Sequence, residues 1–135
     1  MAAKAQKEQF ILSTGRRKTS AARVFLKPGK GAVTINGKKA EQYLTRLQSQ
    51  MVIMQPLELL GQTGKFDMKV TVTGGGESGQ AGAIRHALTR ALVTFNPEWK
   101  LQLKKAGYVM RDPRMVERKK YGQSGARRRF QYSKR

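Results

Sequence analysis

Residues 66–95 read FDMKVTVTGGGESGQAGAIRHALTRALVTF, and this stretch decides the fold. Over residues 66–73 apolar side chains alternate with polar ones, which is the period of a β-strand that buries one face. A glycine-rich turn follows over residues 74–80 and predicts a sharp passage from the strand into a helix. The glycines that we expect to serve this turn are Gly74, Gly75, Gly76 and Gly79.

The helix after the turn is predicted from a single apolar stripe, which would cover the buried face of the strand. Ser78 is a candidate N-cap. Asn96-Pro97 should end this helix and start another, because asparagine caps a helix and proline suits its first turn. The stripe consists of Ile84, Ala87, Leu88, Ala91, Leu92 and Phe95. In the second helix, closed by Gly107, the inward residues should be Trp99, Leu103 and Ala106.

Outside this stretch, apolar periodicity and turn residues predict shorter elements. They are a strand beginning at 10–12, a polar loop over 14–20, a hairpin over 21–35, a helix over 40–47, a short strand or extended segment over 51–55, a brief helix from Pro56 to Leu60, and a last helical piece from 111. This order indicates an α+β fold, a two-layer domain with a small mixed sheet covered on one face by helices. The other face would be polar, basic and free for a partner.

Composition restricts the partners and the chemistry. Lysine and arginine number 28 against 8 acids, which gives a formal charge of +20 and a sequence pI near 11.1. Such a chain suits a polyanion: nucleic acid first, an anionic membrane surface second. No apolar run is long enough to span a bilayer, and the first residues do not resemble a signal peptide. The absence of cysteine excludes disulfides, thiol catalysis and cysteine-based zinc sites.

The C-terminal run, residues 118–135, reads RKKYGQSGARRRFQYSKR, with eight lysines or arginines and no acid. Its three large apolar side chains are too few to offset the entropy of ordering against the domain. We expect it to be extended and to order on a polyanion; a solvated tail that serves only solubility is the alternative. The chain then divides into a flexible N-terminus (1–8), a globular α+β domain that binds RNA (9–110) and a long extended basic C-terminal tail (111–135).

No catalytic set can be assembled from the sequence. The glycine turn could hold a phosphate at the helix start, but a P-loop needs lysine and then serine or threonine after its last glycine. Here Gly79 is followed by Gln80 and Ala81, so a structural turn or an RNA phosphate contact explains the glycines as well. His86, the only histidine, has no visible orienting partner and is expected to make a contact, not to catalyse. We therefore expect no enzyme activity, no cofactor and no metal.

Several segments, taken in order, resemble one family: the ninth protein of the small ribosomal subunit, in its bacterial or organellar form. The segments are Thr14-Gly15-Arg16-Arg17-Lys18, Ala22-Arg23-Val24, Gln55-Pro56-Leu57, the long segment 74–92, Arg111-Asp112-Pro113-Arg114, the segment 117–122, and the terminal Ser133-Lys134-Arg135. Gln123-Ser124 stands where many relatives carry lysine or arginine. Phe130 stands where many have proline, and Tyr132 where phenylalanine is usual.

The resemblance implies a structural protein of the ribosome, cytoplasmic or organellar. It implies binding of 16S-type rRNA in the head of the subunit, near other head proteins, with the tail reaching towards the tRNA in the peptidyl site and no membrane contact. The expected rRNA contacts are Arg16, Arg17, Lys18, Arg23, Arg85, Arg90, Arg111, Arg114, Arg118, Lys119, Lys120, Tyr121, Arg127, Arg128, Arg129, Phe130 and Tyr132. The expected tRNA contacts are Ser133, Lys134 and Arg135. The rivals are a small nucleotide-dependent enzyme that uses the glycine turn and a basic DNA architectural protein.

Overall fold

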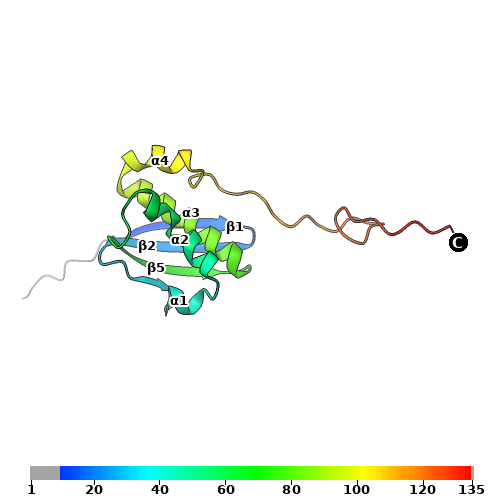
Figure 1. Cartoon of the computed structure of the whole chain (residues 1–135), viewed down its shortest axis with the longest axis horizontal. Helices are drawn as coiled ribbons and strands as arrows, with labels where there is room; N and C mark the ends of the chain where they lie inside the picture. The colour runs from blue at the N-terminus through cyan, green and yellow to red at the C-terminus, as the bar shows by residue number, and fades with distance from the viewer. Residues whose placement is uncertain (1–9, 135) are drawn as a thin grey trace, which may run out of the picture.

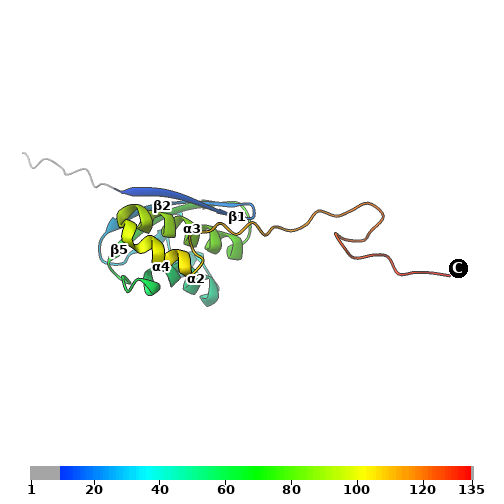
Figure 2. The ribbon, with the colours of Figure 1, turned by 90° about the horizontal axis from the view of Figure 1, so that it is seen from above.

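The computed structural model describes residues 10–134, and these residues form a mixed five-stranded sheet with helices packed on one face (Figures 1 and 2). The strands are β1 (Ile11–Arg17), β2 (Ser20–Pro28), β3 (Val33–Ile35), β4 (Lys38–Lys39) and β5 (Phe66–Thr73). The helices are α1 (Ala40–Tyr43), α2 (Leu47–Leu59), α3 (Glu77–Phe95), the 3-10 helix η1 (Pro97–Trp99) and α4 (Lys100–Lys105). The predicted α+β class and its one-sided helical layer are confirmed.

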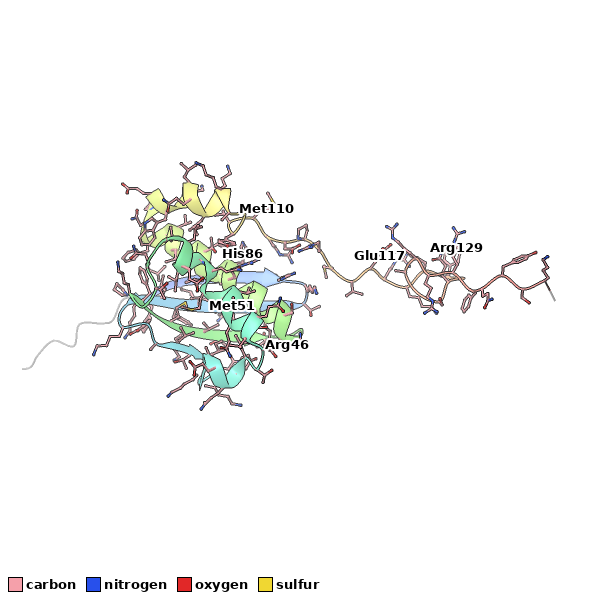
Figure 3. The ribbon with its side chains drawn as sticks, in the orientation of Figure 1. Arg46, Met51, His86, Met110, Glu117 and Arg129 are labelled. Atoms are coloured by element: carbon pink, nitrogen blue, oxygen red, sulfur yellow. The ribbon has the colours of Figure 1, made fainter. Side chains whose placement is uncertain are left out.

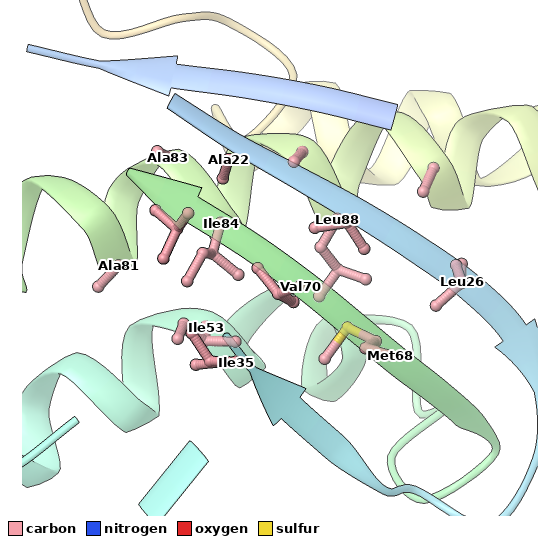
Figure 4. Close-up of a cluster of buried hydrophobic side chains, with 14 of the residues drawn as sticks. Ala22, Leu26, Ile35, Ile53, Met68, Val70, Ala81, Ala83, Ile84 and Leu88 are labelled. Carbon is pink, nitrogen blue, oxygen red and sulfur yellow. The ribbon is translucent and has the colours of Figure 1, made fainter. Parts of the chain in front are cut away.

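The sheet has the order β1-β2-β5-β3-β4, with β3 and β5 parallel and the other neighbours antiparallel. The alternation predicted for residues 66–73 is confirmed, because Phe66, Met68, Val70 and Val72 are buried while the residues between them lie on the other face. The apolar stripe of α3 packs over these side chains (Figure 4). Phe95, at the end of the stripe, is 43% exposed, with its ring in edge contact with that of Phe66.

Gly15 explains how closely β1 approaches α3. A Cβ atom at this position would collide with the backbone carbonyl oxygen of Ala83 and the backbone of Ala87. Only glycine therefore lets this part of the strand lie against the helix. Residues 14–17, expected in a loop, belong to β1, and the reversal into β2 is the tight turn at Lys18, whose φ is 53°.

The predicted hairpin over residues 21–35 is wrong. β2 pairs with β1 on one edge and with β5 on the other, so neither edge is left for β3. The loop after β2 instead crosses to the far side of β5, where β3 pairs in parallel with it. Asp67 holds this loop, because its Oδ1 accepts the N–H groups of Lys30, Gly31 and Ala32, each at 2.9 Å.

The extended segment predicted over 51–55 is also wrong, since these residues lie inside α2, with Pro56 in the helix and not at its start. A short apolar run does not separate a strand from a buried helix. The tertiary contacts decide, because Ile53 and Leu57, one helical turn apart, are both buried in the core. A proline inside a helix is destabilising, and the burial of these apolar side chains offsets that cost.

Smaller differences concern helix ends. α3 begins at Glu77 after Gly76, without a side-chain cap from Ser78, whereas Asn96 caps η1 as predicted by accepting the N–H of Glu98 at 3.1 Å. The helix expected over 40–47 ends at Tyr43. Leu103 is buried and Trp99 partly buried as expected, but Ala106 is exposed. No helix forms from residue 111, where the proline and the acceptor Asp112 favour an irregular segment.

Beyond Gly107 the described chain contains no helix or strand, and it extends away from the domain as it continues towards the C-terminus (Figures 1 and 2). The division into domain and tail stays a prediction. The expected flexible N-terminus, residues 1–8, lies outside the described residues.

Candidate nucleic-acid interface

Arg16 and Arg17 are neighbours on β1, but they lie on opposite faces of the sheet. Arg16 is exposed on the open face. Arg17 lies on the helical face, where its side chain fills the space that a Cβ atom on Gly82 would occupy. Its Nη2 is 3.5 Å from Oδ2 of Asp112, and only about a fifth of each side chain is exposed, 20% and 22%. A phosphate can therefore contact Arg16 directly, whereas Arg17 would first have to break its ion pair with Asp112.

The two arginines of α3 also have partners inside the protein. Arg85 donates from Nη1 to Oε1 of Gln55 at 2.9 Å, and its guanidinium lies 5.2 Å from the ring centroid of Tyr108. Arg90 donates from Nη1 to the carbonyl oxygen of Thr14 at 2.8 Å, joining α3 to β1. In the free protein both side chains therefore link α3 to other elements of the domain. Their predicted RNA contacts would add to that structural role.

His86 lies between these arginines, half-buried, with Nε2 3.3 Å from the carbonyl oxygen of Val109. Burial lowers the pKa of His86, and the charges of Arg90, Arg111 and Arg85 act in the same direction. The ring is therefore neutral at pH 7 and can donate from Nε2 to that carbonyl. It joins α3 to the beginning of the C-terminal segment (Figure 3).

Asp112 anchors the next part of the segment. It accepts the N–H of Arg114 at 3.0 Å and the Nη2 of the same residue at 2.7 Å, besides its ion pair with Arg17. The hydrogen bonds from the Arg114 side chain hold the pKa of Asp112 well below its usual range. We name the contacts of Tyr108, Val109 and Asp112 with α3 and β1 the tail root.

The middle of the tail folds back on itself, which the sequence did not predict. Glu117 pairs with Nζ of Lys120 at 3.3 Å and with Nε of Arg127 at 3.0 Å. The N–H groups of Ser124 and Gly125 donate to the carbonyl oxygen of Arg128, at 3.1 and 3.4 Å. The glycines and the single acid ahead of the basic run were the available signal. The loop contains Gln123-Ser124, where the charge is thinnest.

The outer tail, which we define as residues 118–134, presents its rings and most of its cations to solvent. Tyr121 is 96% exposed, Phe130 68% and Tyr132 84%. Arg128 and Arg129 make no ion pair within residues 10–134, and Lys119 and Lys134 are exposed.

The remaining predicted contacts are placed as follows. Arg111 and Lys18 are exposed as well, while Arg118 donates to the carbonyl oxygen of Lys119 at 3.3 Å. Ser133 is exposed, and Arg135 lies outside the described residues.

The space around the glycine turn is occupied by other residues of this protein. Gly74 and Gly75 have φ angles of 78° and 65°, and a Cβ atom on Gly74 would lie 2.6 Å from the carbonyl oxygen of Thr19. Ser20 Oγ and Gln80 Nε2 both donate to the carbonyl oxygen of Gly74, at 2.9 and 3.0 Å. The glycines thus serve a close approach to the β1–β2 turn. In the described part of the chain no group of three potential metal ligands occurs, and no helix there is long and apolar enough to cross a membrane.

Comparison with known proteins agrees with the resemblance noted in the sequence. The small ribosomal subunit protein uS9 of Syntrophobacter fumaroxidans is 59% identical over 128 residues, which cover 95% of this chain and 98% of that protein. The uS9 proteins of Anaeromyxobacter sp. (strain K) and Anaeromyxobacter dehalogenans are each 56% identical over 127 residues, 94% of this chain and 98% of theirs. The family described as ribosomal protein S9/S16 matches residues 15–135, and the chain belongs to that family.

Proposed function

We propose that this chain is a structural component of the small ribosomal subunit that binds 16S-type rRNA in the subunit head and is not an enzyme. Its relatives are named as small ribosomal subunit proteins, which supports the assignment to that subunit. The observation that carries the RNA contact is the outer tail, where Arg128 and Arg129 stand exposed beside Phe130 and Tyr132, with no acid of the described chain paired to them. Cations for phosphates and rings for unstacked bases are what RNA requires.

The tail is also proposed to reach the peptidyl-site tRNA through Ser133, Lys134 and Arg135. Deletion of residues 130–135 tests this, because the core contains none of them. Small subunits reconstituted with the truncated chain should assemble and survive a high-salt wash, yet bind peptidyl-site tRNA more weakly than subunits with the full chain. Equal tRNA affinity would overturn the tRNA contact. Loss of the chain from washed subunits would show that the rRNA contact depends on the deleted residues.

The full chain itself should bind structured 16S-type rRNA more tightly than duplex DNA of the same length. Each phosphate contact adds a log–log salt slope of about −0.7 to −0.9. An affinity that does not fall between low and moderate salt would contradict the electrostatic account. Preference for the duplex would favour the DNA architectural rival.

A further inference from the structure

The face of the sheet opposite the helices is left open by every described element (Figure 2). Strand register places its side chains in rows, because directly paired residues point to the same side. One row is Thr14, Arg23 and Thr71 across β1, β2 and β5. A second is Leu12, Phe25, Lys69, Thr34 and Lys39, across all five strands of the described sheet.

The charge of this face is mainly positive. Arg16, Arg23 and Lys69 are exposed on it and make no ion pair within residues 10–134. The acid that the described strands place there is Asp67, and its Oδ1 already accepts three backbone N–H groups from the β2–β3 loop. The face therefore attracts an anion, and its cations are fixed at strand spacing, unlike those of the tail.

Rings and small polar groups lie between the cations. Phe25 is partly buried, and its ring meets that of Phe10 edge to face, with centroids 6.2 Å apart. Further along the same strands, the residues that line a hollow of about 360 Å³ include Thr14, Arg16, Ala21, Arg23, Thr71 and Thr73. A shallow sheet with a ring, hydroxyls and cations suits a splayed base and its flanking phosphates. The deep, narrow major groove of an RNA helix does not admit such a surface, and its shallow minor groove offers no splayed base.

Resting on the proposed function, we propose that the open face of the sheet binds an unpaired RNA segment, with one base against Phe25 and phosphates over Arg16, Arg23 and Lys69. The threonine hydroxyls of the hollow donate to or accept from base edges and 2′-OH groups. The expected rRNA contacts included Arg16 and Arg23 but not Lys69 or Phe25, because the face that these residues share forms only when β5 pairs with β2.

The test uses the full chain labelled with ¹⁵N, titrated by NMR with a heptauridylate and with a long-stemmed RNA hairpin closed by a tetraloop, compared at equal phosphate concentration. The amides of Thr14, Arg23 and Thr71 should shift with the unpaired oligomer and shift less with the hairpin. The double variant Arg23→Gln, Lys69→Gln should bind the oligomer roughly tenfold more weakly at 0.15 M salt, as two single-strand phosphate contacts predict. Phe25→Leu should weaken binding by at least about fivefold through lost stacking.

The matched control is Lys104→Gln, Lys105→Gln, which removes the same charge from exposed positions of α4 on the helical side. Every variant keeps the tail, so the tail contributes equally to each affinity. Equal losses in the sheet variant and the control, or shifts confined to helices and tail, would overturn the sheet site while leaving the proposed function intact. Stronger shifts with the hairpin would overturn the unpaired segment. If RNA leaves the sheet amides unshifted but the sheet variant alone is lost from small subunits, the face contacts a protein and the proposal is wrong. A full chain that binds neither RNA would refute the proposed function itself.

Discussion

Three arginines packed in the domain and two arginines of the outer tail are used in opposite ways. Within the domain Arg85 and Arg90 each have an acceptor on another element, and Arg17 pairs with the tail root. In the outer tail Arg128 and Arg129 have no such partner among the described residues. A count of +20 treats all these charges alike. The structure separates cations that hold the fold together from cations that remain available to an external anion.

The largest expected effect separates the two regions by stability. Leu88 is fully buried in α3, and Leu88→Ala should lower the free energy of unfolding by about 2–5 kcal/mol through lost burial and a cavity. Phe130→Ala in the tail, the matched removal of a large apolar side chain, should change it by less than about 0.5 kcal/mol. Urea unfolding followed by circular dichroism measures both. A large loss in the tail variant would erase the distinction between the regions.

The second prediction concerns affinity. Arg128→Gln, Arg129→Gln should reduce the log–log salt slope of rRNA binding by about 1.4–1.8 and weaken binding about 15- to 30-fold at 0.15 M salt, without affecting unfolding. The α4 variant Lys104→Gln, Lys105→Gln carries the same charge change and serves as control. A slope that falls equally in both variants would mean that total charge, and not the tail, governs binding.

The parts of the fold predicted correctly are those in which one strong period dominates, as in β5 and α3. The strand pairing of residues 21–35 could not be predicted, because β3 pairs with β5, which lies more than thirty residues away in the sequence. The helix over Met51–Pro56 was missed because a four-residue apolar run carries no period of its own. In each case a distant contact overrode the local pattern.

The candidate site divides in the same way. The charge and the aromatic content of the tail could be predicted, because they depend only on composition. The expectation that both Arg16 and Arg17 contact rRNA could not distinguish them, since adjacent strand residues face opposite sides and the partner of Arg17, Asp112, lies far along the chain. The loop closed by Glu117 was missed because this acid lies one residue before the basic run 118–135, which contains no acid of its own.

The third prediction makes the same comparison, between a cation that holds the fold together and one that remains available, for two adjacent residues, Arg17 and Arg16. Arg17→Gln should lower the free energy of unfolding by about 1 kcal/mol, the upper end for an ion pair near the surface, and should loosen the tail root. Arg16→Gln should change stability by less than about 0.5 kcal/mol but weaken RNA binding. Urea unfolding and amide ¹⁵N relaxation at Asp112 measure the two effects. Identical stabilities and identical relaxation would show that the tail root does not depend on Arg17.

The smallest expected effect is a pH dependence confined to the domain. The backbone hydrogen bond from Ala32 is the largest cause that lowers the pKa of Asp67, with the N–H groups of Gly31 and Lys30 adding to it and desolvation partly opposing it. Because the folded-state pKa lies below the unfolded value of about 3.9, the stabilisation is fully present above that pH and is lost as the pH falls through the folded pKa. In an acid titration by NMR, the Asp67 carboxyl should titrate below about pH 3.9, and the Ala32 amide should shift with the same midpoint. Asp67→Asn should abolish that titration, while the amides of the outer tail stay unaffected in both proteins. A midpoint at or above the unfolded value would mean that the three N–H groups do not hold the carboxylate, and the acid on the open face would then be free to oppose an RNA phosphate.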